Sequence, residues 1–180
     1  ISNKTRKQEG RFMSMLLGAA FFILHSSFFI SCSSDDDSDD PAIHVSETIA
    51  RYTDVLKSAP NGWAMAFYGN TDFGGYNVLC KFGDNGQVTV ANEVYGPDTT
   101  AVTHYKFEQS GGVVLSFDEY CALFHYFSDP VNPSGFGAGT ADGFGGDLEF
   151  RVISCSADSV VLSGKKHGSR VRLTPLAQGT

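Results

Sequence analysis

Hydrophobic positions recur along this chain with two different periods, and each period predicts a different kind of element. Between residues 43 and 58 they follow helical spacing, at Val45, Ile49, Tyr52, Val55 and Leu56. We expect an amphipathic helix here, with Ser46 as its N-cap and residues 59–62 ending it. Such an apolar stripe is typical of a surface helix that packs one face on a sheet.

After this helix the period changes to two, which is typical of β-strands with one buried face. Trp63, Met65 and Phe67 alternate with Ala64, Ala66 and Tyr68, and residues 76–82 repeat the alternation. Further strands are predicted over residues 87–93, 103–108, 113–117, 148–153, 160–163 and 170–173. Strands at such short, regular spacing predict a mostly β (α+β) fold. We expect an antiparallel sheet, meander or partial barrel with one N-terminal amphipathic helix.

Two segments between the strands have no clear period. Residues 118–128 are aromatic on both faces, so a short buried helix and an extended segment both stay open. Residues 132–146 form a glycine-rich loop that is long for a connection in a compact domain. That length favours a functional or mobile segment.

The first 31 residues have the pattern of a secretory signal. A basic stretch over residues 1–11 precedes an apolar run that His25 interrupts, and Ser31 supplies the small residue before a cleavage site. A membrane-spanning helix needs about 20 near-continuous apolar residues, so the interruption weakens that alternative. The chain starts at Ile1 rather than methionine, which leaves open the true start and whether the chain is a fragment.

The last four residues of this run, Phe29 to Cys32, resemble a lipobox. In such signals the cysteine thiol is lipidated before cleavage, so we expect lipidation at Cys32. Phe29 departs from the usual aliphatic residue, and a signal cut elsewhere or a plain anchor helix are the alternatives. The expected organisation is a signal peptide over residues 1–31, a tether over 32–42 and a β-rich domain over 43–180.

An acidic run follows Cys32 directly and contains Asp35, Asp36, Asp37, Asp39 and Asp40. Such dense like charge favours a solvated spacer, because nothing apolar is available to bury. The alternative of an EF-hand calcium loop is not favoured, because the central glycine of such a loop is missing. The run also resembles the surface-export signal of Bacteroidota lipoproteins. The resemblance implies a lipid-anchored protein on the outer membrane that faces the cell exterior.

Charge and cysteine usage narrow the possibilities further. The net charge is −7, and the chain has no basic stripe, which argues against a nucleic-acid partner. Cys80, Cys121 and Cys155 show no close CxxC spacing, so no zinc or redox site is expected. We favour three buried free thiols, with a Cys80–Cys155 disulfide as the alternative.

Three stretches together resemble a known family. They are Gly62-Trp63 leading to residues 74–77 and Phe82, then residues 115–118 with His125, then residues 146–150 continuing to 162–166. In this order they resemble the N-terminal part of a Bacteroidota lipoprotein family known as domain of unknown function 4302, over residues 43–174. Members are longer, which implies a C-terminal truncation here. The resemblance also implies an outer-membrane lipoprotein near SusC/SusD-type uptake systems, and it supplies no catalytic residue.

Candidate chemistry along the chain is sparse, and no metalloprotease, phosphate-loop or serine-hydrolase motif is present. Five carboxylates offer candidates for a glycoside-hydrolase pair: Asp118, Glu119, Asp142, Asp147 and Glu149. Four aromatic residues are candidates for a platform that binds sugars: Trp63, Tyr68, Phe73 and Tyr76. Of these, Trp63 and Tyr76 are expected in the core. His104 and His125 are the candidates for meeting in space, but no metal or cofactor is expected.

The expected function is therefore that of a surface-exposed lipoprotein without enzymatic activity. It would be an accessory for binding or uptake of glycan or peptide nutrients, with a SusC/SusD-type complex as its candidate partner. The alternatives are an extracellular hydrolase that uses Asp142, Asp147 or Glu149, and a structural or adhesion lipoprotein. No ligand-binding residue is assigned at this stage.

Overall fold

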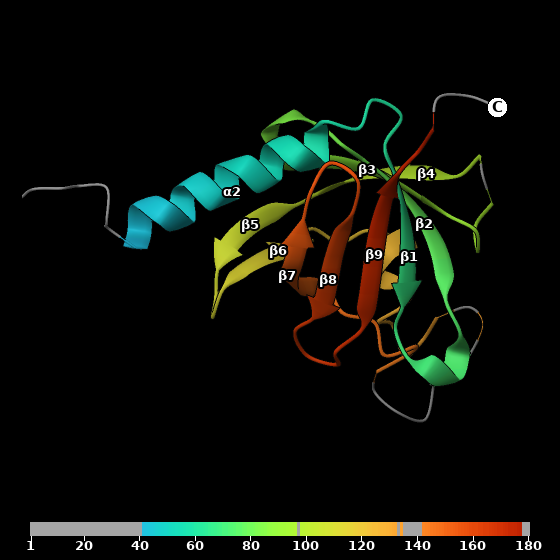
Figure 1. Cartoon of the computed structure of the whole chain (residues 1–180). Helices are drawn as coiled ribbons and strands as arrows, with labels where there is room; N and C mark the ends of the chain where they lie inside the picture. The colour runs from blue at the N-terminus through green and yellow to red at the C-terminus, as the bar shows by residue number, and fades with distance from the viewer. Residues whose placement is uncertain (1–40, 97, 133, 135–141, 178–180) are drawn as a thin grey trace, which may run out of the picture. The chain divides into compact units, whose positions relative to one another are not determined.

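The structure, a computed structural model, describes residues 41–96, 98–132, 134 and 142–177 (Figure 1). These residues belong to the compact unit Ser38–Thr180. Cys32 and the aspartates at positions 35–40 lie outside the described residues, so lipidation and surface export stay predictions. None of the helices within the described ranges is long and apolar enough to span a membrane.

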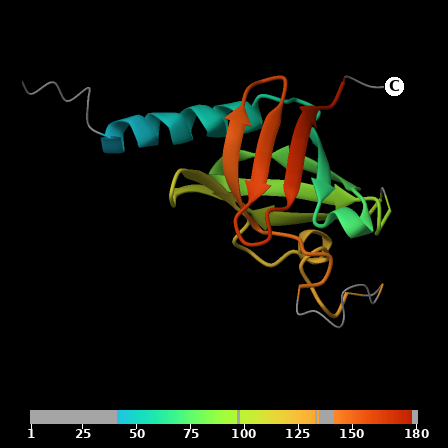
Figure 2. The same ribbon diagram turned by 60° about the horizontal axis from the view of Figure 1, so that its bottom comes forward.

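Nine antiparallel strands form one sheet, which confirms the mostly β prediction. The strands are β1 (Trp63–Tyr68), β2 (Tyr76–Phe82), β3 (Gln87–Asn92), β4 (Thr100–His104), β5 (Lys106–Gln109), β6 (Val113–Ser116), β7 (Glu149–Cys155), β8 (Val160–Gly164) and β9 (Arg170–Pro175). Their order is β4-β3-β2-β1-β9-β8-β7-β6-β5. The β1–β9 ladder thus joins the first strand to the last, and the sheet curls into a nearly closed barrel (Figure 2).

The predicted strand over residues 103–108 is two strands, which meet at Tyr105. β4 pairs with β3 and β5 pairs with β6, so the chain passes from one edge of the sheet to the other here. The backbone N–H of Tyr105 donates to the carbonyl oxygen of Gly86 at 2.6 Å, and its ring packs against Phe82 with centroids 4.9 Å apart. Because Tyr105 is buried and held in this way, it forms a corner instead of continuing a strand.

The predicted amphipathic helix is α2 (Pro41–Lys57). The proposed N-cap at Ser46 is wrong, because the helix starts five residues earlier and the Ser46 hydroxyl donates to the carbonyl oxygen of Ile43 at 2.7 Å. The apolar stripe becomes buried at its C-terminal end, at Leu56. There the indole N–H of Trp63 donates to the carbonyl oxygen of Leu56 at 2.8 Å, which ties α2 to β1.

The inward positions of the strands form the core, as the alternation predicts. The insertion between β6 and β7 completes it with the short helix α3 (Ala122–His125), which decides between the two structures left open for residues 118–128. Phe124 and Phe127 from this insertion pack on Phe67 of β1, with centroids 6.0 and 4.8 Å apart. The chain then returns toward β7 at the lower end of the barrel, away from α2 (Figure 1).

Candidate functional site

The β8–β9 turn wraps around the carboxylate of Asp147, which lies in the segment that enters β7. This carboxylate accepts hydrogen bonds from the backbone N–H groups of Lys166 (2.8 Å), His167 (2.9 Å) and Ser169 (3.1 Å). The Ser169 hydroxyl donates a fourth at 2.7 Å. Burial raises the pKa of the Asp147 carboxyl, but the hydrogen bonds together outweigh it and hold the pKa below its usual value. Asp147 is therefore an ionised anchor for the turn.

The close approach of this carboxylate requires glycine at position 164. A Cβ added to Gly164 would lie 1.8 Å from Oδ2 of Asp147 and 2.4 Å from Oγ of Ser169. The N–H of Gly164 donates to the carbonyl oxygen of Ser169 at 2.7 Å, which closes the turn. The absent side chain thus leaves the space that the carboxylate occupies.

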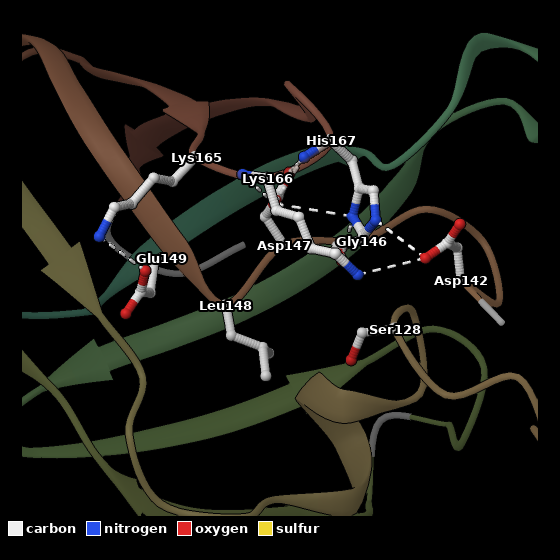
Figure 3. Close-up of a pocket in the computed structure, with 9 residues that line it drawn as sticks. All are labelled: Ser128, Asp142, Gly146, Asp147, Leu148, Glu149, Lys165, Lys166 and His167. Atoms are coloured by element: carbon white, nitrogen blue, oxygen red, sulfur yellow. Dashed lines mark hydrogen bonds and ion pairs between the residues drawn. The ribbon is translucent and has the colours of Figure 1, made fainter.

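Asp142 approaches the same turn from the outside. Its Oδ1 lies 3.2 Å from Nζ of Lys166 and 3.1 Å from Nε2 of His167 (Figure 3). The hydrogen bond from Lys166, followed by that from His167, lowers the pKa of the Asp142 carboxyl. The carbonyl oxygen of Gly146 lies 3.3 Å from Nδ1 of His167. The imidazole of His167 is therefore held from both of its nitrogens.

Two neighbouring pockets share Asp142 and His167 in their linings. The smaller, of about 500 Å³, extends past Ser128 and Leu148 toward Lys165 (Figure 3). The larger, of about 630 Å³, extends toward the β1–β2 connection, which contains the 3-10 helix η2 (Thr71–Phe73). Its polar and aromatic lining includes Tyr68, Asn70, Asp72, Asp142, His167 and Arg170.

Tyr68 supplies the exposed aromatic surface of the larger pocket. Tyr68 is 47% exposed, and its ring lies close to the backbone of Gly75. A Cβ at Gly75 would stand 2.3 Å from Cε1 of Tyr68. Phe73 lines the same pocket, but its ring packs edge-on against Phe144 at 5.3 Å. Tyr68 is therefore the ring that is open to a ligand.

The other two rings of the predicted platform belong to the core. Trp63 is buried, as expected. Tyr76 is half-buried and packs against Phe127 and Phe144, with centroids 5.1 and 5.5 Å apart. The four aromatic residues therefore form no continuous platform, and the accessible part of it is Tyr68 with Phe73 beside it.

The structure brings together three of the five candidate carboxylates. Asp142, Asp147 and Glu149 all line the smaller pocket, and Glu149 lies 3.0 Å from Nζ of Lys165. Each of the three carboxylates therefore already has a donor partner from the β8–β9 turn. Glu119 lines neither pocket.

Asp118, the fifth candidate, lies in a separate cluster with His104. Its carboxylate lies 2.5 Å from Nδ1 of His104 and 3.2 Å from Nζ of Lys106. His125, the other histidine considered, lies 3.1 Å from the backbone of Cys121. The two histidines thus have separate partners, and no group of three metal-ligating side chains converges within the described part of the chain.

All three cysteines of the domain are free. Cys80 and Cys121 are buried, as expected, and burial raises the pKa of the Cys80 thiol. Cys155 is only half-buried, which corrects the expectation for that residue. Burial also raises the pKa of the Cys155 thiol, partly offset by Arg51. These thiols act as small apolar side chains in the fold.

Sequence reasoning missed Asn70, Arg170 and His167 as pocket residues. The side chain of Asn70 accepts from the backbone N–H of Asp72 at 3.0 Å and so shapes η2. The signal that was available is the basic stretch 165–167 between two predicted strands, with acidic residues in the preceding loop. Opposite charges in two turns indicate contact only if both turns lie at the same end of the fold.

The fold and its pockets define a small antiparallel β-barrel domain with a polar cavity at one end. The family described as "Domain of unknown function (DUF4302)" matches residues 38–180, and the chain belongs to this family. Searches of curated proteins and of solved structures each found no match. The family carries no assigned activity in its description, so function must be argued from the site.

Proposed function

We propose that this protein is a non-enzymatic binding module that holds a glycan in the larger pocket. The observation that carries the proposal is the exposed Tyr68 ring beside side chains that can donate and accept hydrogen bonds. Sugars present an apolar ring face together with hydroxyl groups, and they therefore suit a site with both features. Asp72 and Asp142 supply acceptors there, and the guanidinium group of Arg170 supplies donors.

The size and setting of this pocket support the same function. Its volume of about 630 Å³ lies within the range of about 300–1,000 Å³ that is typical of small-ligand sites. The β8–β9 turn that forms one wall is held rigidly by Asp147. A rigid wall favours binding because little conformational entropy is lost when the ligand is held.

Two carboxyl groups argue against the alternative of a glycoside hydrolase. A general acid in such an enzyme needs a carboxyl whose pKa is raised. The pKa values of both Asp142 and Asp147 are lowered by their hydrogen bonds, and Asp147 is bound on all sides by the turn. Neither carboxyl is therefore suited to donate a proton to a leaving group near neutral pH.

A glycan-binding test compares the full chain, purified in a mild detergent, with Tyr68→Ala by glycan array and calorimetry. We expect the substitution to weaken binding by about tenfold or more, which corresponds to about 1.4 kcal/mol. Tyr120→Ala is the matched control, since Tyr120 is 71% exposed and lines neither pocket. Equal binding by the two variants contradicts the proposal, and binding of peptides in place of glycans assigns the pocket to peptides.

The proposed setting is the outer face of an outer membrane, with the lipid at Cys32 and a SusC/SusD-type complex as the partner. The lipobox and the aspartate run support this proposal. Protease treatment of intact cells that carry the wild-type protein should release the domain from the cell surface. A variant with alanine at all five aspartates, Asp35, Asp36, Asp37, Asp39 and Asp40, should be protected. Continued release from that variant contradicts the role of the aspartates in export.

A further inference from the structure

A row of outward-facing residues crosses four strands beside the larger pocket. Arg151 of β7 is paired with Ser163 of β8, Ser163 with Arg170 of β9, and Arg170 with Tyr68 of β1. Residues that pair directly across antiparallel strands place their side chains on the same face. Their neighbours along the strands point into the core, so this row lies on the outside of the barrel.

A third arginine and two apolar residues extend this row. Arg172 follows Arg170 on the same face of β9 and is paired with Val161 of β8. Ile153 lies at the irregularity in the β7–β8 ladder and is 63% exposed. We call the surface formed by these six residues the arginine face: Tyr68, Arg151, Ile153, Val161, Arg170 and Arg172. A pocket of about 570 Å³ includes all of them except Arg151.

The three arginines have no acidic partner within ion-pair distance among the described residues. The carboxylates nearby are already engaged: Glu149 binds Lys165, and Asp142 binds Lys166 and His167. Arg172 makes one hydrogen bond, from Nε to the hydroxyl of Ser159 at 3.3 Å. In a chain of net charge −7, this face therefore concentrates positive charge that the protein itself does not neutralise.

We propose that the arginine face binds an anionic polysaccharide, one that carries carboxylate or sulfate groups along its length. The inference rests on the proposed function and names its substrate class. A guanidinium group binds planar oxyanions through two parallel hydrogen bonds, which makes arginine the residue suited to such groups. Tyr68 and Arg170 line both this face and the larger pocket, so a bound chain continues from one to the other.

The geometry favours a polysaccharide over an acidic peptide. β1, β8 and β9 are each paired on both sides, so their backbones offer no free hydrogen-bonding edge to an extended peptide. Recognition must come from side chains alone. Arg151 and Arg170 lie two strands apart on a rigid sheet. Twice the usual spacing between strands places them roughly 10 Å from each other. That spacing suits two anionic groups that lie about one disaccharide apart along a charged chain.

The test measures binding of the full chain in mild detergent to four polymers: polygalacturonate, dextran sulfate, neutral dextran and polyglutamate. The variant combines Arg151→Gln, Arg170→Gln and Arg172→Gln. The matched control removes three exposed cations elsewhere, through Arg51→Gln, Lys57→Gln and Lys81→Gln, and so has the same net charge. Fluorescence of Trp63, the only tryptophan, verifies that both variants are folded.

We expect the arginine variant to bind polygalacturonate or dextran sulfate at least about tenfold more weakly than the wild-type protein, and the control to stay within about twofold. Preference between these two polymers assigns the anionic group. Equal binding by the variant and its control overturns the inference, and so does a preference for polyglutamate.

The two proposals fail in distinguishable ways. If neutral glycans bind through Tyr68 and the arginine substitutions change nothing, the inference fails and the proposed function stands. If the wild-type protein binds no glycan, neutral or anionic, both fail.

Discussion

The carboxylate of Asp147 connects two segments that are distant in the sequence, the entry to β7 and the β8–β9 turn. A buried charge is costly unless hydrogen bonds replace the water it has lost. Here the backbone donors of Lys166, His167 and Ser169 provide that replacement. If the Asp147 carboxylate is removed, the buried N–H and O–H donors of Ser169 lose their acceptor, as do the part-buried N–H groups of Lys166 and His167. The position therefore matters more for stability than an exposed ion pair does.

We therefore expect Asp147→Asn to destabilise the domain by about 2–4 kcal/mol at pH 7. The pKa of Asp147 is lower in the folded protein than in the unfolded chain, so its stabilisation is present above about pH 4. It is lost as the pH falls through the folded pKa, and the difference between wild type and variant should shrink below pH 4. Urea unfolding followed by Trp63 fluorescence measures this.

Asp158→Asn is the control for that experiment, because Asp158 is exposed in the β7–β8 turn. Its stability should differ little from wild type at either pH. A difference between wild type and Asp147→Asn that stays the same at pH 7 and pH 3 would contradict an ionised anchor.

Sequence reasoning found Asp147 and Tyr68 as candidates but could not assign their roles. A carboxylate in a glycine-rich loop looks the same whether it is catalytic or bound by a turn, because its partners lie about twenty residues further along the chain. The arginine face was not predicted at all. Alternation places Arg170 and Arg172 on one face of a strand, but only the strand register brings Arg151 and Tyr68 beside them.

At the scale of elements, the β8–β9 turn and Asp147 form one unit, because Gly164 leaves room for the carboxylate. Gly164→Ala should destabilise the domain by about 1–3 kcal/mol, since the added Cβ overlaps Oδ2 of Asp147. With Asp147→Ala in the same chain the overlap with the carboxylate is gone, and only the rotatable Ser169 hydroxyl remains close to the added Cβ. We expect the double variant to cost less than the sum of the two single variants, by about 0.5–3 kcal/mol.

Urea unfolding of the four chains in this cycle gives the coupling directly. Gly83→Ala is a suitable control, because the nearest atom to its added Cβ is the carbonyl oxygen of Gln87 at 3.5 Å. That substitution should change stability by less than about 1 kcal/mol. Additive costs for Gly164→Ala and Asp147→Ala would show that the two positions do not act together.

The elements themselves could be predicted where period and turn chemistry agree. β1 and β2 have strict alternation, and their bounds were found. The corner at Tyr105 could not be predicted, because its alternation continues across the break: Thr103 and Tyr105 are both buried. Only the exchange of partner strands there separates β4 from β5.

At the scale of the described domain, the β1–β9 ladder is the contact that makes nine strands one sheet. Every other ladder joins strands that follow one another in the chain. Except for β6 and β7, which the insertion with α3 separates, these strand pairs are hairpins that turn signals can indicate. Pairing between the first and last strands has no local signal. It positions the pocket as well, because Tyr68 of β1 and Arg170 of β9 meet across this ladder.

Nine strands joined into one sheet by this ladder should unfold as one cooperative unit, and two buried thiols can test that. Cys80 lies on β2, and Cys121 precedes α3 in the insertion between β6 and β7. In a variant that combines Cys32→Ser and Cys155→Ser, only these two thiols remain, and neither should react with a thiol reagent until the domain unfolds. We expect their labelling midpoints in urea to coincide with the Trp63 fluorescence transition.

A variant with Cys32→Ser alone is the control for the labelling, since its half-buried Cys155 should react before unfolding. If Cys121 is labelled at lower urea than Cys80, the α3 insertion opens independently of the strands. Such a result would mean that the pocket wall with Asp142 unfolds independently of the sheet with Tyr68. Coincident midpoints would mean instead that the same cooperative structure holds both sides of the pocket, as the packing of Phe124 and Phe127 on Phe67 implies.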